Sequence, residues 1–137
     1  MLRIKEKLDI LKLVMASIKT FKDLIAWQRG HSLVLEVYRV TEIFPKEEQF
    51  GLTSQLRRCA VSITSNIAEG FSRNTYKDKA QFYAIALGSV TELQNQIQIA
   101  HDVGFLSTNE YFNLDTLSIE VHKIINGLLK SSKNLKR

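Results

Sequence analysis

The sequence predicts an all-α protein: an antiparallel, up-down-up-down four-helix bundle with an extra amphipathic helix at its N-terminus. Residues that break helices are scarce, because the 137 residues include one proline and six glycines, whereas sandwiches and barrels need frequent turns. A hydrophobic content of 45% is enough for one packed core. Apolar residues recur every three or four positions along several long segments, which is the spacing of an amphipathic helix.

The N-terminal segment is predicted to be a helix outside the bundle, so that residues 1–18 form a helical extension and residues 19–137 form the bundle. This helix either docks on the bundle or projects from it as an arm. Alternatively, Met15 is the natural start of the protein and the preceding residues are an upstream addition. The face that predicts the helix consists of Ile4, Leu8, Leu11, Met15 and Ile18.

The first bundle helix is predicted at about residues 26–43. A short turn at residues 20–24 should tuck Phe21 and Leu24 inward. Pro45 ends the helix, because proline cannot continue it and disfavours helical geometry in the residue before it. The stripe expected to face the core is Leu33, Val37, Val40 and Phe44.

The second bundle helix is predicted at about residues 54–72, with Thr53 as its N-cap. Its core stripe has spacings of three and four and consists of Leu56, Cys59, Ala60, Ile63, Ile67 and Phe71.

The third bundle helix is predicted at about residues 76–103. Gly88 lies within it and should cost about 1 kcal/mol relative to alanine, so we expect a neighbouring backbone to approach closely there. The residues expected to face inward are Phe82, Ala86, Ser89, Val90, Leu93, Ile97 and Ala100.

The fourth bundle helix has the clearest start, because Ser107 and Glu110 have the spacing of a capping box. Gly104 is expected to end the previous helix in the left-handed conformation. The core residues form a heptad-like seam of Leu114, Leu117, Val121, Ile124, Leu128 and Leu135. Four helices of similar length joined by short loops pack as neighbours.

No residue pattern predicts catalysis, so we expect a protein that is not an enzyme and that needs no metal and no cofactor. His31, His101 and His122 stand alone on separate helices, and phosphate-binding glycine loops and nucleophile elbows are missing. The single cysteine, Cys59, excludes an intramolecular disulfide and falls in the core stripe. No apolar run approaches the roughly 18 residues of a membrane span. The start does not resemble a secretory signal, so we expect a cytoplasmic protein without a membrane partner.

A line of small and polar residues beside the core stripe predicts a contact with another helix or with a second subunit. At about 100° per residue, Gln55, Ser62, Asn66 and Arg73 share a narrow strip of the second bundle helix. Arg58 and Glu69 continue the polar surface around that helix, and Ser89 and Glu92 of the third could lie against it. A solvated face is the alternative, although such faces usually carry long lysine and glutamate side chains. The predicted oligomer interface consists of Gln55, Arg58, Ser62, Asn66, Glu69, Ser89 and Glu92.

The net charge of +5 is unevenly distributed along the predicted bundle. One end collects the start of the first bundle helix, the junction of the second and third, and the end of the fourth, whereas the opposite end is acidic. A cationic end could hold the backbone of RNA or DNA. Phe21, Trp27, Phe71 and Tyr76 lie near it and either stack on unpaired bases or belong to the core. We define the basic end as Lys22, Arg29, Arg73, Lys77, Lys79, Lys130 and Lys133.

Several of these segments together resemble a known family, the four-helix proteins encoded by intervening sequences in bacterial 23S rRNA genes. The match is strongest along the second bundle helix and covers about residues 15–129. The segments that carry it are Phe21–Gln28, Phe44-Pro45, Gly51-Leu52, Gln55–Ile63, Ser65–Gly70, Ala86, Gly88-Ser89 and Glu92-Leu93.

The resemblance implies a homo-oligomer, commonly a pentameric ring, and a similarity to the accessory bundle proteins of diversity-generating retroelements, which bind nucleic acid through a basic surface. It transfers no catalytic residue. Two functions follow as alternatives: an oligomeric bundle that binds RNA or DNA through its basic end, or a protein–protein scaffold without nucleic-acid binding.

Overall fold

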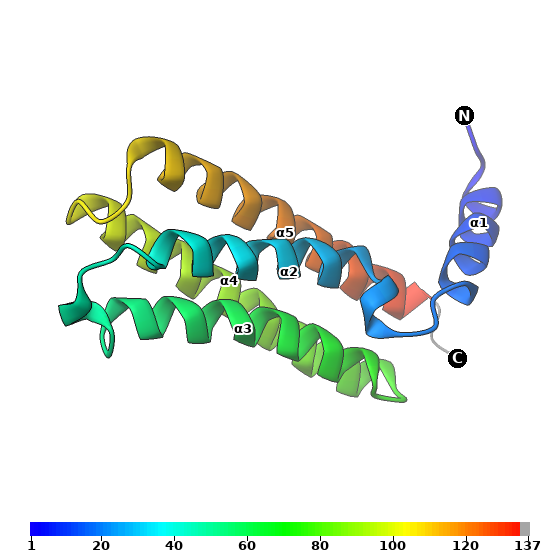
Figure 1. Ribbon diagram of the computed structural model, residues 1–137. Helices are drawn as coiled ribbons and strands as arrows, with labels where there is room; N and C mark the ends of the chain where they lie inside the picture. The colour runs from blue at the N-terminus through cyan, green and yellow to red at the C-terminus, as the bar shows by residue number, and fades with distance from the viewer. Residues whose placement is uncertain (135–137) are drawn as a thin grey trace.

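The computed structural model describes residues 1–134 as five α-helices and two short 3-10 turns, with no β-strand in that range (Figure 1). Helices α2 to α5 lie side by side with alternating direction, which confirms the predicted four-helix bundle, and α1 is the extra N-terminal helix. The helices are α1 (Ile4–Ala16), α2 (Ile25–Thr41), α3 (Leu52–Phe71), α4 (Tyr76–Asp102) and α5 (Thr108–Asn134), and the turns are η1 (Phe21–Asp23) and η2 (Lys46–Glu48).

The core runs along the axis of the bundle and is built from the stripes that the sequence predicts. Each of the four bundle helices contributes aliphatic side chains that are fully removed from water, and this burial is the main force that holds the helices together. The completely buried residues include Leu33 and Val37 of α2, Ile63 and Ile67 of α3, Leu93 and Ile97 of α4, and Leu114 and Val121 of α5.

Helix α3 begins earlier than predicted, and the assignment of Thr53 as its N-cap is wrong. The N-cap is Gly51, and Thr53 is a buried residue of the first turn. The carboxylate of Glu48, in η2, accepts a hydrogen bond from the backbone amide of Leu52 at 3.0 Å. A free helical amide is therefore satisfied from the preceding turn, which leaves Thr53 no capping role.

Helix α4 buries Tyr83 rather than the predicted Phe82. Tyr83 is 1% exposed, whereas Phe82 is partly exposed and lies under the guanidinium of Arg73. Tyr83 lies against Gly70 of α3, because a Cβ atom placed at Gly70 would be 2.6 Å from Cε1 of the tyrosine. The close approach therefore occurs at Gly70. The prediction of such an approach at Gly88 is wrong, since a Cβ atom there would meet nothing within 4 Å.

Helix α5 starts as predicted but has a different seam. The Ser107–Glu110 capping box is present, with amide-to-oxygen distances of 3.0 and 3.1 Å, and Gly104 has a φ of 87°. Besides Leu114 and Val121, the buried residues of α5 are Ser118 and Ile125. The predicted residues Leu117, Ile124 and Leu128 flank them and are partly buried, and Leu135 lies outside the described residues.

Ser118 is tolerated in the core because its hydroxyl is fully engaged. It donates to the carbonyl of Asp115 at 2.7 Å and accepts from the amide of Gln94 at 3.1 Å. The buried polar group therefore has partners on α4 and on its own helix, which avoids the cost of an unsatisfied hydroxyl.

Helix α1 projects as an arm, which is one of the two placements that the sequence left open, rather than docking on the bundle. It projects from the end of the bundle where α2 starts and α5 ends, and it has no extensive contact with another helix of the described chain (Figure 1). Leu2, Ile4 and Leu13 are among the exposed apolar side chains of this N-terminal segment. No helix within residues 1–134 is long and apolar enough to cross a membrane.

Replacing Gly70 and Gly88 by alanine should change stability in opposite directions. We expect Gly70→Ala to lower the free energy of unfolding by about 1–3 kcal/mol, because the new methyl group collides with the buried ring of Tyr83. Gly88→Ala is the matched control in a helix interior with open space, and it should raise stability by about 0.5–1 kcal/mol. Urea denaturation followed by circular dichroism measures both, and an unchanged Gly70→Ala midpoint would contradict the close packing.

Candidate functional site

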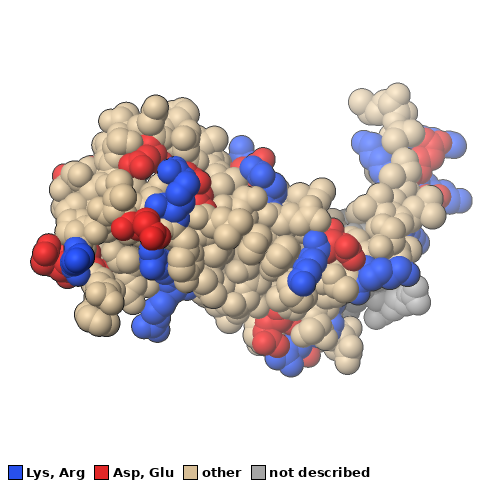
Figure 2. Space-filling model, in the orientation of Figure 1, with Lys and Arg blue, Asp and Glu red and all other residues tan. Residues whose placement is uncertain are grey.

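The four exposed lysines of the predicted basic end come from three separate segments and lie at one end of the bundle. Lys22 is in η1, Lys77 is at the start of α4, and Lys130 and Lys133 are near the end of α5. None of their ammonium groups has a hydrogen bond or ion pair with a residue in the described range. Figure 2 shows further basic side chains along α1, at the same end, with acidic ones among them. This end therefore offers ammonium groups to a polyanion.

The other three cations of the basic end have partners within the protein. Arg29 pairs with Glu120 of α5 at 2.8 Å, and Arg73 pairs with Glu69 at 2.9 Å. Lys79 donates to the carbonyl oxygens of Phe71 at 2.8 Å and of Gly70 at 3.3 Å, so it caps the C-terminus of α3. Partial burial lowers the pKa of Lys79. These side chains therefore stabilise the fold as well as contributing positive charge to the basic end.

The aromatic residues near the basic end pack on their neighbours. Phe21 meets Trp27 edge-on at 5.4 Å between ring centroids, and Trp27 stacks on His31 at 4.7 Å. The ring centre of Phe71 lies 5.4 Å from the ammonium nitrogen of Lys79. The rings of Phe21, Trp27 and Phe71 are only partly exposed, so their contacts favour a packing role over a platform for unpaired bases.

The small polar residues of the predicted interface connect α3 to α4. The hydroxyls of Ser62 and Ser89 are hydrogen-bonded at 2.9 Å, and the Asn66 amide donates to the carbonyl of Ser62 at 2.8 Å. The thiol of Cys59 donates to the carbonyl of Ser89 at 3.0 Å. The strip is thus partly a contact between two helices of one chain. A contact with another helix was one of the alternatives that the sequence predicted.

The rest of this strip borders a surface hollow of about 290 Å³ between α3 and α4, which we call the α3–α4 hollow. Most of the predicted interface residues converge on it. Asn66 does not line the hollow itself but is hydrogen-bonded to Ser62, which does. Glu69 pairs with Arg73 instead. The hollow is lined by Gln55, Arg58, Cys59, Ser62, Ser89, Glu92 and Gln96.

Gln96 is a member of the α3–α4 hollow that the sequence pattern did not indicate. Its side chain is 6% exposed, and its Oε1 has no hydrogen-bond partner within the described chain. A buried amide oxygen without a donor costs about 1–3 kcal/mol. Position 96 follows Glu92 by one helical turn, and that spacing was the available signal.

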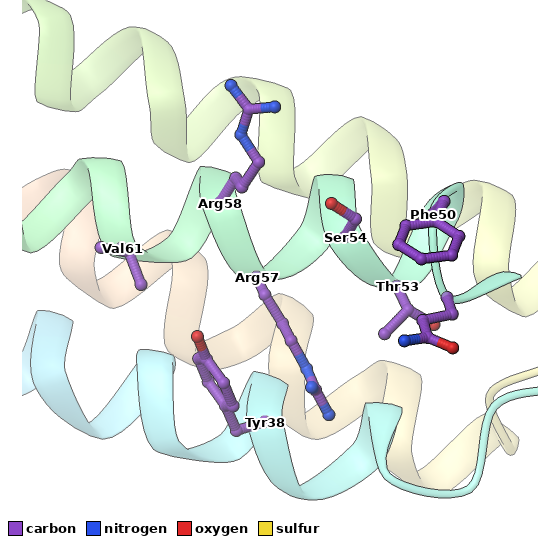
Figure 3. A pocket seen from close by; sticks show the side chains of 8 residues that line it. Tyr38, Phe50, Thr53, Ser54, Arg57, Arg58 and Val61 are labelled. Atoms are coloured by element: carbon purple, nitrogen blue, oxygen red, sulfur yellow. The ribbon is translucent and has the colours of Figure 1, made fainter. Parts of the chain in front are cut away.

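A second hollow, of about 600 Å³, lies between α2 and α3 and is shown in Figure 3; we call it the α2–α3 hollow. The guanidinium of Arg57 lies 4.6 Å from the ring centre of Tyr38, and its Nε donates to the Thr41 hydroxyl at 2.9 Å. Arg58 points to the other side of α3. Among the described residues no carboxylate contributes to the lining, which consists of Tyr38, Gln49, Phe50, Thr53, Ser54, Arg57, Arg58 and Val61.

The α2–α3 hollow combines hydrogen-bond donors with an exposed ring, since Phe50 is 91% exposed. It can receive an acceptor-rich or anionic surface. The sequence did not reveal it, because Arg57 and Arg58 are ordinary members of a charged helix until Tyr38 and Phe50, from other segments, are placed beside them.

The histidines and the cysteine lie in separate surroundings in the part of the chain that the structure describes. Within residues 1–134, no three His, Cys, Asp or Glu side chains are grouped so as to hold a metal ion. His101 stacks on Tyr111 at 4.7 Å, and His122 contacts the Asn126 amide at 3.3 Å. Burial, with a smaller contribution from the charge of Glu92, raises the pKa of the Cys59 thiol to about 12.

The fold and these surfaces define an α-helical bundle whose notable features are surface hollows and a cluster of exposed cations. Residues 22–127 match the family model of the 23S rRNA-intervening sequence proteins, so the chain belongs to that family. Helix α1 precedes the matched region.

A solved structure supports the fold. It is a protein with unknown function from the S23 ribosomal protein family of Bacteroides thetaiotaomicron VPI-5482. The two share 18% sequence identity with a TM-score of 0.72, and the alignment covers 80% of this chain and 98% of the other. A comparison with curated proteins gives no match.

Alkylation of Cys59 should be slow in the folded protein. With a pKa of about 12 against an ordinary 9, the thiolate fraction at pH 8 is roughly a thousandfold lower than in the unfolded chain. The iodoacetamide rate in native buffer should rise through pH 10 without a plateau, whereas in urea it should level off above about pH 9. Cys59 is the single cysteine, so mass spectrometry gives an unambiguous signal. A plateau below pH 10 in native protein would mean that the thiol is not buried.

Proposed function

We propose that this protein is a non-enzymatic, cytoplasmic homo-oligomer that binds RNA or DNA through its basic end. The observation that carries the proposal is the set of four lysines, Lys22, Lys77, Lys130 and Lys133, which three distant segments bring to one end without an acidic partner among the described residues. Exposed ammonium groups bind phosphates and release counterions, so they contribute to affinity in low salt.

Helix α1 supports the same proposal. It leaves the bundle at the basic end and carries more basic than acidic residues. Arg3, just before it, is engaged by Glu6 at 2.8 Å. A flexible polyanion that lies across the lysines of the bundle could continue along α1.

The outer face of α4 supports self-association. Between Lys79 and His101 its sequence contains one charged residue, Glu92. The face includes the open position at Gly88 and borders the α3–α4 hollow, where the Oε1 of Gln96 needs a donor. A second copy could supply that donor and cover the uncharged surface. A ring, commonly of five copies as the family resemblance implies, would turn weak phosphate contacts into avidity.

A protein–protein scaffold is the second candidate, and the α2–α3 hollow is the observation that favours it. Tyrosine and arginine are enriched at the energetic centres of protein interfaces, and here Tyr38 and Arg57 stack in the hollow that Phe50 also lines. The two functions differ in salt dependence, because counterion release makes nucleic-acid binding fall steeply with salt.

Neutralising lysines at the basic end should weaken RNA binding. We expect the double variant Lys77→Gln/Lys130→Gln to reduce the slope of log K against log salt by about 0.7 for each phosphate that the variant no longer neutralises. Fluorescence anisotropy of a labelled single-stranded RNA across a salt series measures this slope.

The matched control for that experiment changes the same charge elsewhere. Lys46, in η2, and Arg39, of α2, lie toward the opposite end of the bundle, where Arg39 is paired with Glu36 of its own helix. Lys46→Gln/Arg39→Gln should leave the slope unchanged. Equal effects of the two double variants would indicate that only net charge matters, and the basic-end proposal would then fail.

A bulky charge on the outer face of α4 should dissociate the oligomer. Gly88→Arg points into open space in the single chain, so we expect the fold to persist while the assembly is lost. Asn113→Arg is the control at an exposed position of α5. Light scattering coupled to gel filtration measures the mass, and an intact oligomer of the Gly88→Arg variant would exclude this face as the contact.

A further inference from the structure

Helix α1 has an apolar face that the described chain does not cover. It is 13 residues long, and isolated helices shorter than about 12–15 residues are marginal in water. On this face Ile4 is 78% exposed, whereas Leu8 and Leu11 are partly exposed. Leu13, on the opposite side of the helix, is 74% exposed. No other helix within residues 1–134 packs extensively on α1. A helix of this length with uncovered leucine and isoleucine side chains needs a partner surface.

The same chain has an unfilled apolar groove next to the base of α1, with a volume of about 570 Å³. One wall is a face of α5, because positions 124, 127, 128 and 131 have the spacing of one helical stripe. Among the described residues, Asp23 is the one charged residue that lines it. The walls consist of Ile124, Gly127, Leu128 and Ser131 of α5, of Leu24, Ile25 and Ala26, and of Val14, Ser17 and Ile18.

The centre of the α5 wall can accept another helix at close range. A Cβ atom added at Gly127 would meet nothing within 4 Å. Gly127 and Ser131 are small and one helical turn apart, with Ile124 and Leu128 beside them. Alternating small and large side chains form the groove into which the ridge of a second helix packs.

The stripe on α1 fits this groove in length and chemistry. Ile4, Leu8 and Leu11 repeat at steps of four and three, so they extend over about two helical turns, as the positions from Ile124 to Ser131 do. The lysines of α1 outnumber its acids, so its charge does not oppose Asp23 at the edge of the groove.

We propose that α1 of one copy packs into the α5 groove of a second copy, and that the exchange is reciprocal. The chain's own α1 leaves the groove at residues 14–18 and projects away from the bundle (Figure 1). Because its last turn forms the rim of the groove, two copies related by a two-fold axis can each place α1 on the other. The contact is separate from the α3–α4 hollow and does not depend on nucleic-acid binding.

Disulfide trapping between two differently labelled chains tests the exchange. In a Cys59→Ala background, full-length Leu8→Cys protein is mixed with full-length Gly127→Cys protein and oxidised. We expect a mixed disulfide dimer on a non-reducing gel. Glu6→Cys replaces Leu8→Cys in the control, because it lies about 200° away around the helix, and it should give little mixed dimer.

Three outcomes would overturn the proposal. One is the absence of a mixed dimer. Another is that a chain carrying both Leu8→Cys and Gly127→Cys forms only an intramolecular disulfide, since α1 would then cover the groove of its own chain. The third is that the full-length protein co-sediments tightly with anionic phosphatidylglycerol vesicles and that their presence abolishes the cross-link. Helix α1 would then be a membrane-surface helix.

The experiment also separates this contact from the proposed assembly through α4. Gly88→Arg should retain the mixed disulfide even if the larger oligomer dissociates. Conversely, Leu8→Asp should prevent the exchange while the α4 contact persists. Loss of the cross-link in the Gly88→Arg variant would mean that α1 exchange is a by-product of the other interface, which contradicts an independent contact.

Discussion

The packing of Tyr83 on Gly70 sets the register between α3 and α4, and the α3–α4 hollow and part of the basic end depend on that register. The ring occupies the space that a side chain at position 70 would need. With this pair in place, Ser62 meets Ser89 about two turns farther along, and Lys79 reaches the last carbonyls of α3. One steric requirement thus positions the α3–α4 hollow and part of the basic end.

Much of the fold could be predicted from the sequence, because the inward stripes of Leu33, Ile63 and Leu93 follow the helical period closely. The sequence-based predictions were wrong where the choice between two adjacent residues decides which side chain faces the core. Adjacent positions on a helix differ by about 100°, so Phe82 and Tyr83 were both compatible with the pattern. Phe82 instead covers the surface beside Arg73, and the small size of Gly70 made room for the ring of Tyr83.

The surfaces were less predictable than the core, since they depend on contacts between distant segments. The sequence located the cations, but it could not show that Arg29 is paired with Glu120, which lies three bundle helices later. The α2–α3 hollow similarly needs Tyr38, Phe50 and Arg57 from separate segments. The α3–α4 strip was found because its members on α3 repeat along that helix, whereas Gln96, on α4, lies outside that repeat.

Lys79 contributes a positive charge to the basic end and also stabilises the C-terminus of α3. Its ammonium group holds two main-chain carbonyls at the end of α3 and is partly withdrawn from water. A phosphate that captured this ammonium group would have to release those carbonyls, and the final turn of α3 would begin to fray. Ligand capture at this lysine would therefore be coupled to local unwinding, unlike capture at the exposed side chain of Lys77, which can reorient without cost to the backbone.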